Sequence, residues 1–330
     1  MKKYATICGI DISKNSLDIC MLNTDHPKEI QHHVIGNDEK SILSFLKTII
    51  KEGTLFCMED TGVYSMPLCY QLDDQEFDYA IIPAIQIKRS KGLCRGKTDK
   101  SDAKDIANYA LTHLHQIELH RLPEEDLQEL KLLLAERDKL INAIKLFESS
   151  QESLSFIKQK IGKATQKHNL KTTKHLQKQM ESLEQLIASL IEKNEIMNEQ
   201  MNLLQSIPGI GPQTALLLIS YTRAFTSFKN WRQLACYCGI APFEYQSGKS
   251  IRGRTKVSHY AQKRLKSAIH LAALTSKRFD GEMKKYFERK VAEGKNKMLV
   301  INAVRCKLIA RAFAVINRGT PFVNIQKFAA

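Results

Sequence analysis

The hydrophobic and polar positions of the first 120 residues alternate in short runs that favour strands and helices in turn. Runs rich in apolar and β-branched residues and bounded by polar or turn residues are typical of strands. Apolar residues spaced three and four apart are typical of helices. The expected elements are strands at 4–12, 16–22, 29–35, 55–58 and 79–82, and helices at 37–52 and 100–114.

The middle of the chain carries heptad spacing. Apolar residues fall on a heptad from 130 to 161, and a second run follows from 176 to 204 with Asn194 at an interior position. Gly162 and the polar residues up to Thr173 are expected to separate the runs. We therefore expect two long helices with coiled-coil seams, in which a single interior Asn can fix the register. The pattern leaves open whether the seam closes within one chain or between chains.

The residues that follow predict a mainly helical C-terminal region. It opens with Ile207-Pro208-Gly209-Ile210-Gly211 and an apolar helix that reaches Tyr221. This arrangement is similar to a helix-hairpin-helix, in which glycines let a tight turn approach a phosphate and N–H groups at the helix start bind it. Gly209 and Gly211 are therefore candidate nucleic-acid-binding residues. A plain turn between two helices is the alternative.

Charge separates this chain from most globular proteins of its size. The formal net charge is +15, and residues 247–330 alone carry an excess of +16, from 20 Lys and Arg against 4 Asp and Glu. Such a basic block favours polyanions, because Lys and Arg that neutralise phosphates release condensed counterions. A solvated, solubilising surface is the other reading.

Cysteine usage and hydropathy bear on the compartment. The eight cysteines are scattered without paired ligand spacing and are expected to be buried hydrophobes in a reducing compartment. Neither a signal peptide nor an apolar run of about 18 residues for a membrane span is evident. We therefore expect a cytoplasmic protein without a membrane partner.

Four acidic residues stand where the predicted elements begin or end. Asp11 ends one apolar strand and Glu59 ends another, while Asp99 and Asp102 lie three apart at a helix start. A carboxylate at the end of a buried strand is costly unless a metal or another partner neutralises it. Acids at a helix start also stabilise the helix dipole, so each acid has a structural alternative.

The order of the expected elements predicts the fold class of this region. Three strands in a meander, followed by alternating helices and strands, are the element order of an α/β RNase H-like fold.

Together the four carboxylates suit phosphodiester chemistry. Two divalent ions about 3.5–4 Å apart can stabilise the attacking and leaving oxygens of an in-line displacement. Hard Mg²⁺ or Mn²⁺ prefers such oxygen ligands. Asp18 and Asp60 are nearby carboxylates that could bind the metal instead of one of the four acids. Asp18 is expected on the solvated face of the second strand.

A second candidate group surrounds Ser247. Ser247-Gly248 is followed by Lys249, Arg252, Arg254 and Lys256. The serine could be a nucleophile, with cations that stabilise charge developing on a phosphate. The spacing by itself favours a flexible basic loop that grips the DNA backbone, with the serine as a turn residue.

Three segments resemble the acidic motifs of the DEDD insertion-sequence transposases, a family that includes Piv-type DNA invertases and RNA-guided bridge recombinases. The segments are Gly9–Lys14, Glu59–Tyr64 and Lys97–Ala103. The C-terminal half is similar to the family's second domain through residues 207–211, 239–242 and 247–248.

The resemblance implies a RuvC-like catalytic domain at 1–122, a coiled-coil oligomerisation region at 123–203 and a C-terminal transposase domain at 204–330. It implies that Asp11, Glu59, Asp99 and Asp102 bind metal and that Ser247 joins covalently to a DNA 5′ phosphate. It also implies double-stranded DNA, a homo-oligomer and a noncoding guide RNA as partners. Asp60 stands where the family usually has a small residue, and Glu59 fits its acid position.

Three other functions use parts of the same pattern. A Holliday-junction resolvase or RuvC-like nuclease without strand joining would need the four acids, but neither the coiled coil nor the Ser247 segment. A sugar-kinase-like ATPase also places an Asp after its first strand, yet no Gly-rich phosphate loop follows Asp11. A non-enzymatic architectural protein would bind DNA without metal-dependent cleavage.

Overall fold

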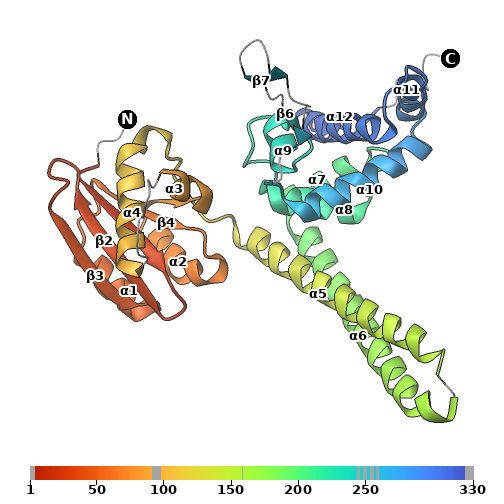
Figure 1. The fold of residues 1–330 in the computed structure, drawn as a ribbon, viewed down its shortest axis with the longest axis horizontal. Helices are drawn as coiled ribbons and strands as arrows, with labels where there is room; N and C mark the ends of the chain where they lie inside the picture. The colour runs from red at the N-terminus through yellow and green to blue at the C-terminus, as the bar shows by residue number, and fades with distance from the viewer. Residues whose placement is uncertain are drawn as a thin grey trace. The chain divides into compact units, whose positions relative to one another are not determined.

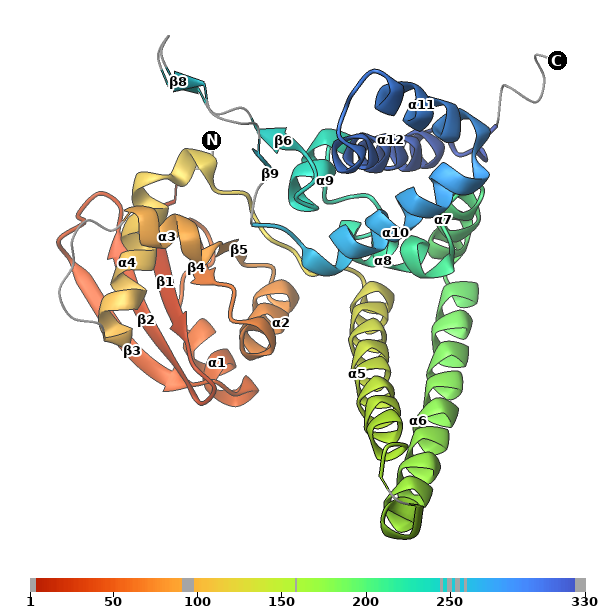
Figure 2. The same cartoon turned by 45° about the vertical axis from the view of Figure 1, so that its right-hand side comes forward.

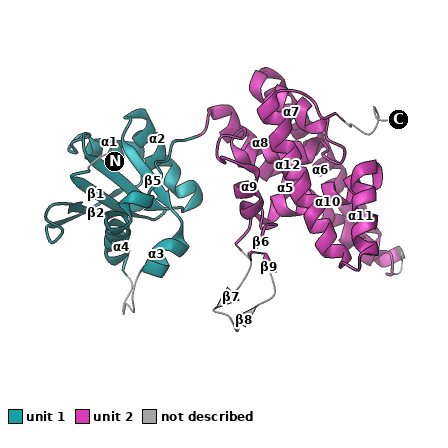
Figure 3. Ribbon diagram, turned by 90° about the horizontal axis from the view of Figure 1, so that it is seen from above, with its two compact units in different colours: residues 1–122 teal, residues 123–330 magenta. Residues whose placement is uncertain are grey.

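The computed structural model describes residues 4–90, 98–157, 159–243, 246–247, 251–252, 256–257 and 260–323. The chain forms two compact units, residues 1–122 and residues 123–330, coloured separately in Figure 3.

Unit 1 is built on a five-stranded mixed sheet with the order β3-β2-β1-β4-β5. Its strands are β1 (Thr6–Ile12), β2 (Ser16–Asn23), β3 (Ile30–Gly36), β4 (Thr54–Glu59) and β5 (Asp78–Ile82). The first three pair antiparallel as a meander, and β4 and β5 extend the sheet in parallel from β1. The expected order of a meander followed by alternating helices and strands is confirmed, and it is consistent with an RNase H-like fold.

Four α-helices belong to unit 1 in its described residues. They are α1 (Glu39–Leu46), α2 (Met66–Asp74), α3 (Ala84–Ser90) and α4 (Asp99–Thr112). Two 3-10 turns, η1 (Gly62–Ser65) and η2 (Leu114–Gln116), complete the unit. Helix α1 ends six residues before its expected end at 52, because the chain turns through 47–53 to enter β4. Helices α2 and α3 were not expected, since two short helical segments provide too few turns for a clear apolar period.

The two faces of the sheet have separate apolar layers. Alternate strand residues such as Cys8 and Ile10 pack with α1 and α2, while Ile7 and Cys57 pack with α4. Figure 1 shows α4 lying along the sheet. A side chain at Gly9 would overlap the backbone of Ala103 and Ala107, so the helix contacts β1 directly at that glycine. Gly9 therefore sets how close α4 approaches the sheet.

Unit 2 begins with a long antiparallel helical hairpin, visible in Figure 2, made of α5 (Glu125–Leu154) and α6 (Gln159–Lys193). The expected separator from Gly162 to Thr173 was wrong, because these residues are helical within α6. Gln166 Nε2 donates to the carbonyl of Leu154 at 3.2 Å, and Asn169 Nδ2 donates to Ser150 Oγ at 3.0 Å. Contacts with the end of α5 thus favour helix where the polar composition suggested a break.

The expected interior role of Asn194 in a seam was also wrong. Helix α6 ends at Lys193, and Asn194 is the N-cap of α7 (Glu195–Gln205), where its side chain accepts from the Met197 N–H at 3.0 Å. Its Nδ2 donates to Asp126 Oδ2 at 2.7 Å. Since an N-cap side chain satisfies free N–H groups at a helix start, Asn194 marks a break between two helices.

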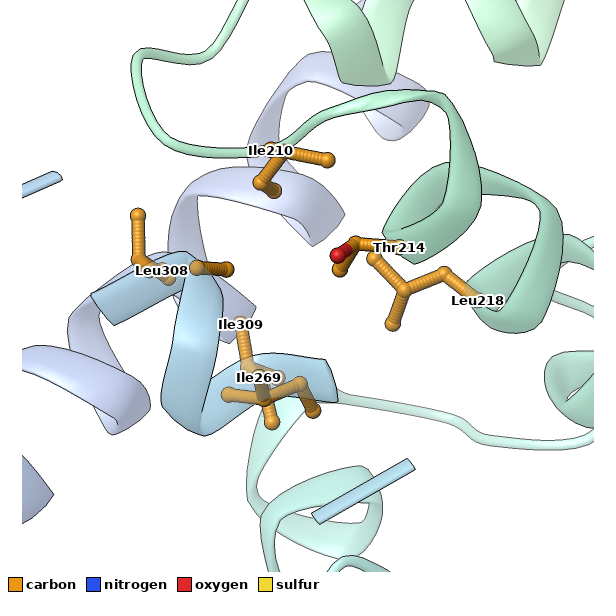
Figure 4. Close-up of a pocket in the computed structure, with 7 residues that line it drawn as sticks. Ile210, Thr214, Leu218, Ile269, Leu308 and Ile309 are labelled. Carbon is orange, nitrogen blue, oxygen red and sulfur yellow. The ribbon is translucent and has the colours of Figure 1, made fainter. Parts of the chain in front are cut away.

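The remaining described elements of unit 2 follow α7. They are α8 (Pro212–Thr222), α9 (Trp231–Tyr237), α10 (Lys263–Phe279), α11 (Gly281–Ala292), α12 (Lys297–Arg318) and the two-residue strands β6 (Pro242–Phe243), β7 (Gln246–Ser247), β8 (Ile251–Arg252) and β9 (Lys256–Val257). One apolar core joins α5, α6 and the later helices. A small pocket between α8, α10 and α12 is lined by Thr214 and aliphatic side chains, so it belongs to this core (Figure 4). None of the described helices is long and apolar enough to cross a membrane.

Candidate catalytic site and nucleic-acid interface

Asp11 and Glu59 lie at the carboxyl ends of two neighbouring parallel strands, β1 and β4. Strands β1 and β4 pair in parallel with Ile10 beside Met58, so the next residue of each strand is an acid. Because side chains alternate along a strand, Asp11 shares a face with Gly9, and Glu59 shares it with Cys57. That face is the one covered by α4. The two carboxylates are partly buried, and the parallel register places them next to each other.

Helix α4 brings the other two acids to the same end of the unit. Thr98 and Ser101 form a capping box at its start, and Asp99 and Asp102 lie in its first turn. The chain leaves α4 and returns to the start of β5, where the His120 N–H donates to the Tyr79 carbonyl at 2.7 Å. The helix therefore runs opposite to the parallel strands, and its N-terminus lies toward their carboxyl ends.

The spacing of helix and strand supports that alignment. Helix α4 contacts β1 around Gly9 with Ala103 and Ala107. Two strand residues span about 6.6 Å, which a helix covers in about four residues. Counting back from this contact puts the first turn of α4 level with Asp11. Asp102 is partly buried there and Asp99 is exposed.

The four carboxylates lie at one end of the unit, but they are not close enough together to form a complete metal-ligand set. Across the residues that the structure describes, no three Asp, Glu, His or Cys side chains are close enough together to hold a metal ion. Asp11 and Asp102 each interact with a neighbouring group. The donor set, all carboxylate oxygen, still fits a hard divalent ion.

Asp18 lies elsewhere than expected. It pairs with Asp11 across β1 and β2, and its side chain is 14% exposed. Its Oδ1 contacts His32 Nε2 of β3 at 3.1 Å. The expectation of a solvated face was wrong, because directly paired residues of antiparallel strands point to the same face, here the one beneath α4. Asp18 precedes Cys20 by two residues in β2, so the two side chains lie on the same face. This spacing was the signal in the sequence that Asp18 would be covered.

Asp60 has a local structural role. It is exposed, and its Oδ1 accepts from the Gly62 N–H at 3.0 Å. Gly62 has a φ of 66°, which a glycine adopts readily. The bond closes a turn directly after β4, which is typical of an Asp in this position.

The two glycines before α8 differ in their surroundings. Gly209 has a φ of 101°, and a Cβ on it would lie 2.6 Å from the Ala272 carbonyl oxygen and 2.7 Å from Ser276 Cβ of α10. Helix packing alone thus requires glycine there. Gly211 is the exposed N-cap of α8, with open space where a Cβ would stand.

We name residues 242–257 the basic arm, and its described residues pair in two short antiparallel ladders. Pro242 and Phe243 pair with Val257 and Lys256, and Gln246 and Ser247 pair with Arg252 and Ile251. The ladders place Ser247 in the inner one, directly opposite Ile251. The candidates Lys249 and Arg254 lie outside the described residues.

Comparison with known proteins covers both units. A family model described as a transposase, of the DEDD type of IS110 elements, matches residues 8–150. A second, described as transposase of the IS116/IS110/IS902 family, matches residues 201–288. Together the matched ranges include all four acids and Ser247.

Relatives match nearly the full length. The pilin gene-inverting proteins of Moraxella lacunata and Moraxella bovis are 28% and 29% identical over 96% of this chain and 97% of theirs. An uncharacterized 43.6 kDa protein of insertion element IS110 from Streptomyces coelicolor is 31% identical over 43% of this chain and 34% of its own length. The chain therefore belongs to the DEDD transposase family of IS110-type insertion elements, a family of recombinase enzymes that depend on divalent metal.

Proposed function

We propose that this protein is the transposase or site-specific recombinase of an insertion sequence, and that it cleaves and rejoins DNA strands. Asp11, Glu59, Asp99 and Asp102 would bind two Mg²⁺ or Mn²⁺ ions. The observation that carries the proposal is the parallel register that ends β1 and β4 in adjacent acids on the face where the first turn of α4 lies.

The elements that carry the four acids support this proposal. Two carboxylates are carried by strands of one sheet and two by a helix that Gly9 seats directly on that sheet. Rigid elements of this kind hold ligands more accurately than loops do. The partial positive charge of the α4 N-terminus favours ionised acids in its first turn. Divalent ions bound there would stabilise the attacking and leaving oxygens of a phosphodiester.

The second chemical group in the proposal is Ser247 on the basic arm. Its Oγ would attack the phosphorus of a DNA phosphodiester and form a serine–5′-phosphate bond. The P–O3′ bond breaks, and the 3′ oxygen leaves with a proton, while the serine proton passes to a base. Lys249, Arg252, Arg254 and Lys256 would stabilise the charge on the phosphate. A serine hydroxyl is a weak nucleophile and needs such a base or a metal.

The helical hairpin supports the proposal of a homo-oligomer. Leu146, Phe156 and Ile161, near the turn between α5 and α6, are each at least 70% exposed. Exposed apolar side chains lose contact with water when a partner covers them, and this favours association. We propose a second copy as that partner, and double-stranded DNA with a noncoding guide RNA as nucleic-acid partners. The positive excess of residues 247–330 suits both nucleic acids.

A covalent intermediate tests the proposal against its alternative, a RuvC-like nuclease that hydrolyses DNA. Wild-type protein would be incubated with labelled DNA from the element ends in Mg²⁺, denatured and mapped by mass spectrometry. We expect a DNA adduct at Ser247 in the wild type and none in Ser247→Ala. Ser250→Ala, a neighbouring serine in the same arm, is the control and should form the adduct. Cleavage without any adduct would favour the nuclease.

A further inference from the structure

The basic arm is attached to the helical unit at two points. At its start, the carbonyl of the fully buried Ile240 accepts from Asn302 Nδ2 of α12 at 2.7 Å. Cys306 Sγ, one turn further along α12, donates to the same carbonyl at 3.8 Å. After the arm, the Gln262 N–H donates to the Tyr237 carbonyl at 3.0 Å. The orientation of the arm therefore depends on these contacts at its base.

Asn302 is the end of a longer chain of hydrogen bonds. Arg305 Nη1 donates to Asn302 Oδ1 at 3.3 Å. Arg305 Nη2 lies 2.5 Å from His270 Nδ1 of α10. Because a guanidinium has no acceptor atom, His270 must accept at Nδ1 and carry its proton on Nε2. This series of hydrogen bonds thus connects α10, α12 and the base of the arm.

Arg305 carries a buried charge that no carboxylate of the described residues neutralises. Its residue exposure is 9%, and its Nε has no hydrogen-bond partner. Across the described residues, no carboxylate forms an ion pair with it. Burying an unneutralised charge is unfavourable, so a hydrophobic residue of similar volume would serve stability better. The presence of a guanidinium at this position is therefore not explained by its effect on stability.

We infer that Arg305 and Asn302 are positioning residues for the basic arm, and so for the strand that carries Ser247. An Asn amide can rotate to present either its oxygen or its nitrogen. The Arg305 donor occupies Oδ1, which leaves Nδ2 to face the Ile240 carbonyl. His270 in turn holds the guanidinium in place. The catalytic part of this inference rests on the proposed role of Ser247; the anchoring part does not.

The anchoring part is tested first by amide hydrogen exchange of the full-length protein without DNA. Asn302→Asp keeps the size of the side chain and the acceptor for Arg305, but it has no donor for Ile240. Losing one such bond should speed exchange at 240–243 and 256–257 by about tenfold. Exchange in the core of α12 should stay unchanged. Asn317→Asp, on an exposed Asn of the same helix, is the matched control. Unchanged exchange at the arm base would overturn the inference.

Arg305 is tested by conservative replacement. Arg305→Lys keeps the charge but cannot reach Asn302 and His270 with two planar donor groups. We expect it to speed exchange at the arm base as Asn302→Asp does. If Arg305→Lys exchanges its amide hydrogens at the arm base at the wild-type rate, Arg305 does not position the arm.

The functional part uses adduct formation on element-end DNA and, separately, affinity for a 30-bp duplex of arbitrary sequence. For Asn302→Asp we expect the adduct to form about tenfold more slowly, the effect of one missing hydrogen bond, with duplex affinity close to wild type. Faster arm exchange with a wild-type adduct rate would refute the positioning role. If wild-type protein forms no adduct at all, the proposed role of Ser247 fails, and the exchange data still decide whether the arm is anchored.

Discussion

Asp11 lies directly opposite Asp18 in the antiparallel pairing of β1 with β2, and both side chains lie on the face beneath α4. Two acids in this relationship destabilise a sheet unless a positive group offsets their charge. Asp18 Oδ1 contacts His32 Nε2 at 3.1 Å. Asp18 therefore contacts the outer strand β3, whereas Asp11 lies beside Glu59 at the edge proposed for catalysis.

This relationship leads to a prediction about which acids act. Replacing Asp11, Glu59, Asp99 or Asp102 by its isosteric amide should lower strand cleavage at least about 100-fold, because carboxylates that share metal ions act as a unit. Cleavage of DNA with element ends in Mg²⁺ measures the rate, and circular dichroism checks the fold. Near wild-type cleavage by any one variant would remove that residue from the site.

Two acids next to the site are the matched controls. Asp60→Asn keeps an oxygen that can accept from the Gly62 N–H, and Asp18→Asn keeps one for His32. Both variants should retain cleavage within a few-fold of wild type. Loss of cleavage in Asp60→Asn with normal cleavage in Glu59→Gln would reverse the assignment of the ligand.

Gly9 should tolerate no side chain. In Gly9→Ala the new methyl group overlaps the backbone of Ala103 and Ala107, so α4 must move away from the sheet. Overpacking of this kind costs about 1–3 kcal/mol of unfolding free energy, measured by urea titration. Gly281→Ala in α11, where a Cβ meets open space, should be neutral or slightly stabilising. Equal stability of wild type and Gly9→Ala would contradict the close contact.

Nucleic-acid binding should depend steeply on salt through the basic arm. Changing Lys249, Arg252, Arg254 and Lys256 to Gln should lower the slope of log K against log salt by about 0.9 for each phosphate that the arm no longer neutralises. Fluorescence anisotropy with a labelled duplex from 50 to 300 mM salt measures it. Neutralising Lys28 and Lys40, exposed in unit 1, serves as the control and should change the slope less. An unchanged slope in the arm variant would place the phosphate-binding cations elsewhere.

Acid should destabilise unit 2 through His270. Burial, and then the charge of Arg305, lower the pKa of His270 below its usual 6.5. The unfolded state therefore binds this proton more readily, so the stability contribution is complete above pH 6.5 and is lost as the pH falls through the folded pKa. The urea midpoint should drop from pH 7.5 to pH 5.0 more in wild type than in His270→Gln. Equal drops would show that His270 contributes nothing to the pH dependence.

The sequence by itself determined the local features of this protein. Apolar runs and their polar ends located all five strands of unit 1 and put Asp11 and Glu59 at strand ends, since burial of alternate or successive residues leaves a direct trace in the chain. Asp99 and Asp102, three apart at the start of the helix expected from residue 100, likewise lie in the first turn of α4. The family motifs then led to the proposed metal-binding role of the acids and the proposed nucleophile Ser247.

The tertiary structure decided everything that depends on contacts between distant residues. It set the strand register that places Asp18 beside Asp11, and it made Asn194 a cap through contacts that include Asp126, 68 residues away. Gly209 packs against α10, and Arg305 binds His270 across two helices. None of these roles leaves a periodic pattern, because each arises when segments far apart in the chain meet and their polar groups and small residues must match.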